Sequence, residues 1–256
     1  MYSLGIDSGS TMTKAVLFDG VNIVRKVILP TTANPKESIQ DVYRTLYTSE
    51  VGYTVTTGYG RNLLNEADKK VTEITCHAMG AAYLRPEVRA VIDIGGQDCK
   101  AVLLDRDQHV VDFLMNDKCA AGTGRFIEVM MRTLEMPIEK IDSFTKDCKA
   151  VNISSMCTVF AESEIVSLLA KGEQPGDIAL GVIHSICRRT AFFAQKMQLE
   201  GDVFFSGGLA QFEVFQKTME QYLKRTICTD ELSQYAGALG AAVIGWRKKQ
   251  GQSKCF

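Results

Sequence analysis

Several features that mark other classes of protein are missing from this 256-residue chain. Its formal net charge is only −1, so no strong field gathers nucleic acid or anionic lipid around it. No segment reaches the run of about eighteen apolar residues that a transmembrane helix needs. The first residues, Met1 to Gly5, lead directly into a predicted strand, without the basic and then apolar pattern of a signal segment. We therefore expect a cytoplasmic protein that binds neither nucleic acid nor membrane.

The eight cysteines lack the dense spacing of a small secreted disulfide scaffold. Cys76 and His77 are adjacent, but no CxxC or HxxxH pattern accompanies them, so we interpret both as buried packing residues. We expect Cys255 to be an exposed thiol near the end of the chain. A packing role is also expected for Cys99, Cys148, Cys187 and Cys228.

One segment of the chain occurs twice. Residues 6–19, IDSGSTMTKAVLFD, align with residues 92–105, IDIGGQDCKAVLLD, at a constant offset of 86, with eight identities in fourteen positions and no gap. Each copy has an apolar segment, an aspartate, a glycine-containing turn and a second apolar segment, which predicts a β-hairpin. A third apolar segment follows each copy, at Asn22 to Leu29 and around Val110 and Phe113. The chain therefore contains the same three-strand unit twice.

Helical patterns follow both three-strand units. Apolar periodicity predicts helices over residues 36–47, 73–84, 124–134, 158–171 and 176–199. A short strand at Val203 to Phe205 precedes a glycine pair, and a final helix is predicted over residues 234–249. Strands followed by helices in each half indicate an α/β protein.

The two hairpin turns have the composition of a phosphate site. Glycine lets backbone N–H groups approach an anion closely, and hydroxyl and ammonium groups add donors. A single glycine turn is ordinary in a hairpin, but two copies with the same aspartate favour a clamp on one triphosphate. The expected nucleotide contacts in the hairpins are Ser8, Gly9, Ser10, Thr11, Lys14, Gly95 and Gly96. Asp7 and Asp93 are the candidate catalytic carboxylates and hold Mg²⁺ through water, and Gln97 is the candidate for orienting the attacking water.

Two later glycine pairs extend this pattern. Gly207 and Gly208 lie where a strand leads into a helix, and Gly237 and Gly240 begin the last helix, so a base or ribose can approach the backbone at both places. Each pair alone is common in αβ connections. The order of hairpin, second hairpin, Gly-Gly and terminal Gly-Ala-Leu-Gly resembles that of the sugar kinase, Hsp70 and actin ATPase superfamily. The resemblance implies two ribonuclease-H-like lobes with ATP or ADP in the cleft between them.

The repeat also divides the chain. We expect lobe I to comprise residues 1–87, with the first hairpin, and to be completed by the C-terminal helix at 234–256. Lobe II then comprises residues 88–233, with the second hairpin, the adenosine site and two cysteine-containing segments. No low-complexity linker separates the lobes, so this boundary depends on the repeat alone.

The two cysteine-containing segments are NDKCAAGTGRF at 116–126 and SMCTVFAESE at 155–164. Cys119 and Cys157 each stand just ahead of a predicted helix, where free N–H groups and the helix dipole favour a thiolate. A 4Fe-4S cluster takes about four cysteine ligands, so two per chain predict a cluster shared across a homodimer. The first segment also contains further expected nucleotide contacts, Gly122, Thr123 and Gly124.

Seven segments together carry a closer resemblance over nearly the whole chain. These are GIDSGSTMTK, TGYGR, EITCHAMGA, IDIGGQDCK, NDKCAAGTGRF, CTVFAESE and GALGAA. They are similar to those of the 2-hydroxyacyl-CoA dehydratase activators (archerases) and the related ATPase subunits of benzoyl-CoA reductase. Ser233 stands where that family often has proline, and Leu209 where it often has valine, which are conservative departures.

This resemblance implies a function. A homodimer with one bridging 4Fe-4S cluster, ligated by Cys119 and Cys157 of each chain, takes an electron from ferredoxin or flavodoxin. ATP hydrolysis then drives delivery of that electron, at low potential, to a dehydratase or reductase component with its own iron–sulfur cluster. The favoured partner is a 2-hydroxyacyl-CoA dehydratase, and a benzoyl-CoA reductase or a double-cubane reductase is the alternative. Nothing in this chain separates the dehydratase from the double-cubane reductase.

Two functions of other classes stay open. A small-molecule kinase of the amino-sugar type needs a catalytic base, for which Asp117 is the candidate. A nucleotide-driven switch like actin needs a polymer surface. For several residues near the proposed sites, two explanations stay open. One is a functional contact, and the other is an ordinary role at the surface, in a turn or at a helix end. These residues are Tyr59, Arg61, Asp98, Lys118, Arg125, Glu162 and Glu164.

Overall fold

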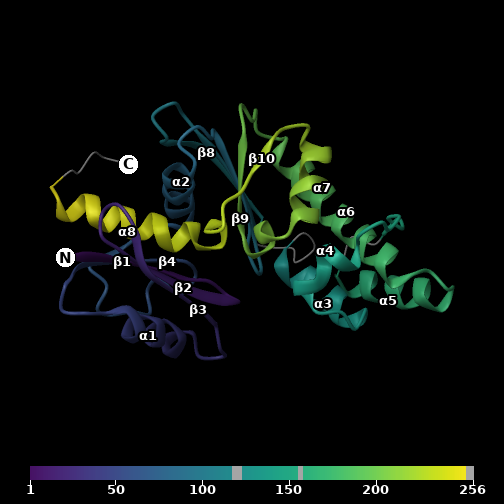
Figure 1. Cartoon of the computed structure of the whole chain (residues 1–256), viewed down its shortest axis with the longest axis horizontal. Coiled ribbons are helices and arrows are strands. Elements are labelled where there is room, and N and C mark those ends of the chain that lie inside the picture. Colours follow the sequence, from purple (N-terminus) through teal and green to yellow (C-terminus); the bar gives the residue numbers. More distant parts are fainter. Residues whose placement is uncertain (117–122, 155–157, 252–256) are drawn as a thin grey trace.

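The computed structural model describes residues 1–116, 123–154 and 158–251, and these form two five-stranded sheets with helices on their faces (Figure 1). The first sheet has the strand order β3-β2-β1-β4-β5. Its strands are β1 (Tyr2–Ser8), β2 (Met12–Phe18), β3 (Ile23–Pro30), β4 (Val51–Thr57) and β5 (Lys69–Lys70). Strands β1, β2 and β3 are antiparallel neighbours, whereas β4 runs parallel to β1.

The second sheet repeats this topology, with the order β10-β9-β6-β7-β8. Its strands are β6 (Ala90–Ile94), β7 (Cys99–Leu104), β8 (Val110–Asn116), β9 (Val203–Gly207) and β10 (Ile227–Cys228). In both sheets the hairpin aspartate lies opposite the hairpin lysine: Asp7 pairs with Lys14, and Asp93 with Lys100. The predicted three-strand units are confirmed, and the duplication of the topology extends to the fourth and fifth strands of each sheet.

The helices mostly begin and end near the predicted positions. They are α1 (Pro35–Leu46), α2 (Glu73–Leu84), α3 (Gly124–Thr133), α4 (Ile141–Phe144), α5 (Thr158–Ala170), α6 (Pro175–Ala194), α7 (Glu213–Leu223) and α8 (Ala236–Lys249). Short 3-10 turns occur at η1 (Ile138–Lys140), η2 (Gly208–Gln211) and η3 (Ser233–Tyr235). The prediction that the long helix starting at residue 176 reaches Leu199 was wrong. The amides of Lys196 and Met197 donate to carbonyl groups three residues earlier, as in a 3-10 turn, and this ends the α-helix.

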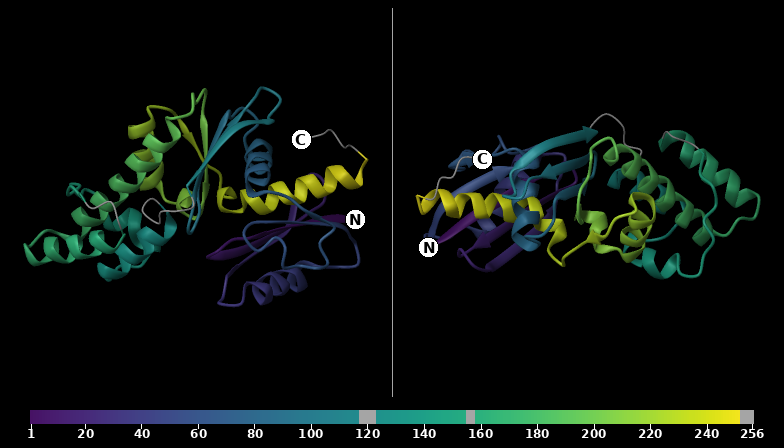
Figure 2. Two further views of the ribbon diagram at one scale, coloured as in Figure 1. Left: turned by 180° about the vertical axis from the view of Figure 1, so that it is seen from behind. Right: turned by 90° about the horizontal axis from the view of Figure 1, so that it is seen from above.

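Helices cover both faces of each sheet. Leu4 and Ile6 of β1 pack with Ile39 and Val42 of α1 on one face of the first sheet, and α8 and α2 lie on the other. One face of the second sheet shares a hydrophobic core with α3, α5, α6 and α7, and the other face packs on α2. In the views from behind and from above, these four helices gather at one end of the molecule, away from the first sheet (Figure 2). Helix α2 therefore contacts both sheets.

Helix α8 lies directly on the first sheet because its residues are small. A Cβ on Gly5 of β1 would come within 2.1 Å of the Ala238 carbonyl oxygen, and the Ser3 hydroxyl donates to the Ala242 carbonyl at 2.7 Å.

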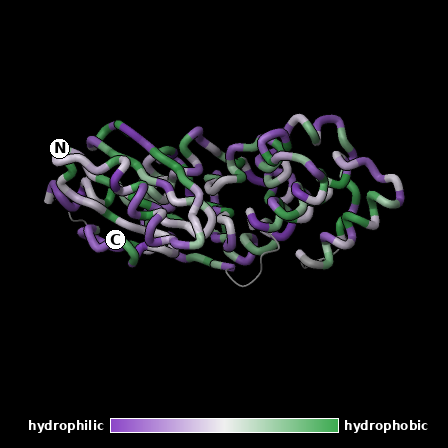
Figure 3. The backbone as a smooth tube through the Cα atoms, turned by 90° about the horizontal axis from the view of Figure 1, so that it is seen from below, coloured by the Kyte–Doolittle hydropathy of each residue, from purple (hydrophilic) through white to green (hydrophobic). Residues whose placement is uncertain are grey.

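Hydrophobic and hydrophilic segments alternate along the described backbone (Figure 3). Within the described ranges, no helix combines the length and the apolar character that crossing a membrane requires.

Candidate functional site

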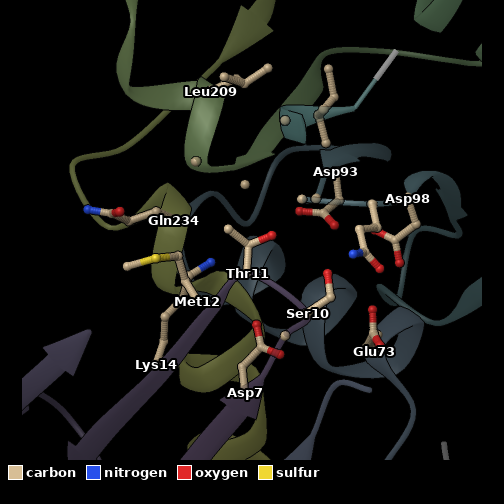
Figure 4. Close-up of a pocket in the computed structure, with 18 of the residues that line it drawn as sticks. Asp7, Ser10, Thr11, Met12, Lys14, Glu73, Asp93, Asp98, Leu209 and Gln234 are labelled. Carbon is tan, nitrogen blue, oxygen red and sulfur yellow. The ribbon is translucent and has the colours of Figure 1, made fainter. Parts of the chain in front are cut away.

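A cavity of about 640 Å³ lies between the two hairpin turns (Figure 4). The first hairpin lines it with Asp7, Gly9, Ser10, Thr11, Met12 and Lys14. The second lines it with Asp93, Gly95, Gly96, Gln97, Asp98 and Lys100. In the close-up, Asp7 and Lys14 approach from the strands of the first sheet, and Asp93 and Asp98 from the opposite side. The repeated segments thus face each other across one space, as a clamp on a single ligand requires.

The two turns are built alike and nearly touch. The Gly9 amide donates to the Met12 carbonyl at 3.1 Å, and the Gly95 amide donates to the Asp98 carbonyl at 2.9 Å. A Cβ on Gly96 would come within 2.0 Å of the Thr11 hydroxyl oxygen. Glycine at this position therefore lets the two turns approach each other, in addition to leaving its amide accessible.

The two repeated aspartates are buried, and their surroundings differ. Burial raises the pKa of Asp7, and the positive charge of Lys14 offsets only part of this increase. Burial alone would also raise the pKa of Asp93, but the charges of His77 and Lys100 outweigh it and hold that pKa well below its usual range. The cavity therefore holds at least one firmly ionised carboxylate.

The two repeated lysines also differ. Lys100 is 2% exposed, and its Nζ lies 2.8 Å from Glu73, 2.8 Å from Asp98 and 3.2 Å from Asp93. Burial would lower the pKa of this ammonium, but the three carboxylates outweigh that effect and raise it. Lys14 is half-buried and lines the cavity, and within the described part of the chain it has no ion-pair partner. Lys14 is thus the ammonium that is available to an anionic ligand.

Two residues of α2 complete the site, although sequence reasoning did not select them. Glu73 begins the helix and reaches Lys100, and His77 follows one turn later, 4% exposed, between Asp7 and Asp93. The interpretation of His77 as a buried residue is confirmed, but the ring lines the cavity as well. The spacing of an acid and a histidine four residues apart on a predicted helix was the available signal.

The far side of the cavity is less charged. Gly207 and Gly208 line it together with Leu209, Phe212 and Gln234. Gly207 has φ of +93°, where a side chain would be strained, and an added Cβ on Gly208 would have no heavy atom within 4 Å. Open backbone beside apolar and amide side chains suits a flat heterocycle with polar edges.

Other predicted contacts lie elsewhere. Ser8 is fully buried, and its Oγ has no hydrogen-bond partner within the described ranges. Gly240 faces α2, where a Cβ would lie 1.8 Å from the Cys76 carbonyl oxygen, and Gly237 faces Asp7 and His77. Neither glycine lines the cavity, so close helix packing explains both without a direct contact to a ligand. Thr123 is the buried residue ahead of α3, and Gly124 does line the cavity.

The beginning of α3 is bonded to the second hairpin turn. The Gly124 amide donates to the Gly95 carbonyl, and the Arg125 amide to the Gly96 carbonyl, both at 2.8 Å. Helix α3 also contacts α5, where the Thr133 hydroxyl donates to Glu162 at 3.3 Å. The two helices that follow the cysteine-containing segments are therefore neighbours, and one of them is attached to the cavity.

Several predicted residues lie outside the described ranges, so their placement is not tested. They are Asp117, Lys118, Cys119, Gly122, Cys157 and Cys255. Among the cysteines that are described, Cys76, Cys99 and Cys187 are buried, and burial raises the pKa of Cys76 and Cys99 to about 12. These thiols are protonated at neutral pH, as the packing interpretation expects.

Comparison with known proteins agrees with this architecture. Residues 4–245 match the sequence profile of the BadF/BadG/BcrA/BcrD ATPase family. An uncharacterized protein of Escherichia coli K12 is 49% identical over 96% of this chain and 97% of its own length. The (R)-2-hydroxyglutaryl-CoA dehydratase activating ATPase of Acidaminococcus fermentans is 43% identical over 97% of this chain and 98% of its own.

Solved structures give the same result. The crystal structure of component A of the Acidaminococcus fermentans (R)-2-hydroxyglutaryl-CoA dehydratase has a TM-score of 0.91 at 42% identity, over 98% of this chain and 99% of that one. The activator of 2-hydroxyisocaproyl-CoA dehydratase from Clostridium difficile, solved with bound ADPNP, also has a TM-score of 0.91, at 36% identity over 100% of this chain and 99% of that one. A glucokinase of the ROK family from Streptomyces griseus, at 12% identity and a TM-score of 0.61, shares the fold alone.

Proposed function

Since this chain belongs to the BadF/BadG/BcrA/BcrD ATPase family, we propose that it is the ATP-dependent electron-transfer activator of a 2-hydroxyacyl-CoA dehydratase-type enzyme. The observation that carries the proposal is the cavity between two repeated hairpins in a chain that matches named dehydratase activators over almost its full length. The activity is ATP hydrolysis coupled to delivery of a low-potential electron. The protein acts in the cytoplasm.

The residues of the cavity fit a magnesium nucleotide. Gly9, Gly95 and Gly96 make close-set turns that an added Cβ would fill, which suits a polyphosphate. Lys14 supplies a free ammonium for the phosphates. Five carboxylates line the cavity, from Asp7, Glu73, Asp93, Asp98 and Glu128, against the cationic side chains of Lys14, Arg61 and Lys100. This excess of hard oxygen ligands favours a divalent cation.

Each part of the site then has a role. Asp7 and Asp93 hold Mg²⁺ through water, and Gln97 orients the attacking water. Gly207, Gly208 and the neighbouring apolar residues receive the adenosine. The carbonyl groups of Gly95 and Gly96, held by the amides at the start of α3, transmit any shift of the second turn to that helix. A nucleotide changes the positions of the helices only if it binds one arrangement of the protein more tightly than another. In this proposal ATP and ADP favour different arrangements.

In this proposal Cys119 and Cys157 would hold a 4Fe-4S cluster, which would supply the one-electron redox chemistry. In the sequence, Cys119 precedes α3 and Cys157 precedes α5. These two helices contact each other. Two thiolates per chain supply half of the usual ligand set, and a homodimer supplies the rest. Ferredoxin or flavodoxin is the donor, and the acceptor is a dehydratase or reductase component with its own cluster.

The proposed lobes are residues 1–87 with 234–256, and residues 88–233. In support, each sheet is built from strands of one of these segments, and α8 packs on the first sheet.

The small-molecule kinase alternative rests on fold likeness alone, since the kinases compared are 12% to 14% identical.

A direct test follows the cluster's visible absorbance. Anaerobic, dithionite-reduced protein is mixed with an oxidised dehydratase component and Mg²⁺. With ATP, the absorbance of the oxidised cluster returns as the electron leaves, and with ADP it does not. Reoxidation at one rate with ATP, ADP or no nucleotide would contradict the proposed coupling.

A further inference from the structure

A single imidazole ring stands between the two repeated aspartates. His77 Nδ1 lies 3.3 Å from Asp93 Oδ1, and His77 Nε2 lies 3.8 Å from Asp7 Oδ2. Asp7 belongs to β1 of the first sheet and Asp93 to β6 of the second, while His77 belongs to α2, which contacts both. The ring is therefore in a position to set the separation of two carboxylates that come from different sheets.

The orientation of the ring is fixed by a chain of hydrogen bonds. His77 Nδ1 lies 2.9 Å from Ser206 Oγ, and the Ser206 hydroxyl donates its hydrogen to the Ser233 carbonyl at 3.3 Å. Because that hydrogen is used, Ser206 Oγ accepts from His77, and Nδ1 carries a proton. The same N–H faces Asp93, and the other ring nitrogen faces Asp7.

The main chain of α8 leaves the room that this arrangement needs. A Cβ on Gly237 would lie 2.6 Å from Asp7 Oδ2 and 2.8 Å from His77 Nε2. A residue larger than glycine would have to push the carboxylate and the ring apart. Gly237 therefore belongs with the histidine and the aspartate, rather than with the nucleotide contacts that the sequence predicted.

The second oxygen of Asp93 is also anchored to α2. Lys100 Nζ lies 3.2 Å from Asp93 Oδ2 and 2.8 Å from Glu73 Oε2. Glu73 and His77 lie four residues apart on α2, so they share one face of the helix. Asp93 is thus held on one side by His77 and on the other through Lys100 and Glu73.

We propose that His77 is a positioning residue, which acts through Asp7 and Asp93 to hold the two carboxylates at the separation that a magnesium nucleotide requires. The inference rests on the proposed placement of Mg²⁺ between these aspartates, and it concerns nucleotide binding rather than electron transfer. Partners that orient metal-binding groups from behind typically change metal affinity or activity about 10- to 100-fold when removed.

The test compares ADP binding with and without Mg²⁺ by titration calorimetry. His77→Leu removes both ring nitrogens, and we expect ADP affinity in Mg²⁺ to fall about 10- to 100-fold, while affinity in EDTA stays within about twofold of wild type. His77→Asn keeps an N–H donor near the Nδ1 position and restores most of the Mg²⁺-dependent affinity. Ser206→Ala, a milder change, gives a smaller loss in the same direction and serves if His77→Leu does not fold.

A matched control is available in α6. His184 is a half-buried histidine whose Nδ1 lies 3.0 Å from the Tyr222 hydroxyl, and it does not line the cavity. His184→Leu should leave ADP affinity unchanged in both buffers. Thermal unfolding of every variant separates a loss of folding from a loss of binding.

Each result of these titrations supports or contradicts the positioning role of His77. Wild-type affinity for ADP in Mg²⁺ in folded His77→Leu and Ser206→Ala overturns the inference, and so does an equal loss with and without Mg²⁺, which indicates a purely structural role. Failure of His77→Asn to restore binding also counts against it. Absence of any ADP binding by the wild-type protein overturns the proposed function and this inference together, whereas the other results leave the proposed function intact.

Discussion

The two lysines of the repeat show how one pattern serves two purposes at the residue scale. Lys14 and Lys100 occupy the same position opposite the hairpin aspartate. Three carboxylates surround Lys100, whereas Lys14 lines the cavity and has no ion-pair partner among the described residues. The surroundings of the two lysines therefore differ because Glu73 and Asp98 lie beside Lys100. Glu73 is not part of the repeat.

The same substitution should have different effects at these two positions. We expect Lys14→Met to weaken ATP binding about 10- to 100-fold, because a charged hydrogen bond to phosphate is lost, with little change in stability. Lys100→Met leaves buried carboxylates without their counter-charge and should lower the free energy of unfolding by about 3 to 5 kcal/mol. Calorimetry and urea unfolding measure the two effects, with the exposed Lys217→Met as control. A destabilised Lys14→Met with normal affinity would contradict these assignments.

Sequence reasoning recovered part of the site at this scale. The aspartates and turn glycines were predicted because the repeat marks them, and local turn chemistry depends on neighbouring residues. Glu73 and His77 were missed as site residues because their significance arises only when α2 lies between two sheets. Gly237 and Gly240 were assigned to the nucleotide because a small-residue helix start is compatible with both a ligand and a second helix.

At the scale of elements, α2 and α8 pack closely enough for backbone to touch backbone. A Cβ on Gly80 of α2 would lie 2.0 Å from the Ala236 carbonyl oxygen, and one on Gly240 of α8 would lie 1.8 Å from the Cys76 carbonyl oxygen. These neighbours are backbone atoms, which cannot rotate away. The position of α2 between the sheets, and with it the position of His77, depends on these glycines.

Gly240→Ala tests this packing. Alanine favours a helix over glycine by up to about 1 kcal/mol, but forcing the two helices apart should outweigh that gain and lower the free energy of unfolding by about 1 to 3 kcal/mol. Gly208→Ala is the matched control, since its Cβ meets no heavy atom within 4 Å, and we expect a change within about 0.5 kcal/mol. Urea unfolding that shows equal stability for both variants would contradict the packing argument.

Element prediction succeeded where apolar periodicity was strong and failed elsewhere. Strand β4 was missed because buried Thr54, Thr56 and Thr57 give it a polar sequence, although they lie in the middle of the sheet. Helix α7 was missed because its buried face mixes the polar Thr218 with the apolar Phe215, Met219 and Leu223. Tertiary packing, rather than local preference, decides both.

At the scale of the whole molecule, the two copies of one topology face each other across the cavity, and α3, whose first amides bond to the second turn, contacts α5. The fold class and family were predictable, because motifs spaced along the chain carry that information, and the comparisons confirm them. The acyl-CoA substrate of the proposed partner enzyme was not, because the groups that would bind that substrate belong to another chain.

The decisive measurement of the proposed cluster is the iron and acid-labile sulfide content of anaerobically purified protein, with Cys119→Ala and Cys157→Ala measured beside the wild type. We expect about four iron and four sulfide for every two wild-type chains, loss of both in either variant, and unchanged ATP binding in all three proteins. Wild-type protein without iron after anaerobic reconstitution, or variants with undiminished iron, would contradict this expectation.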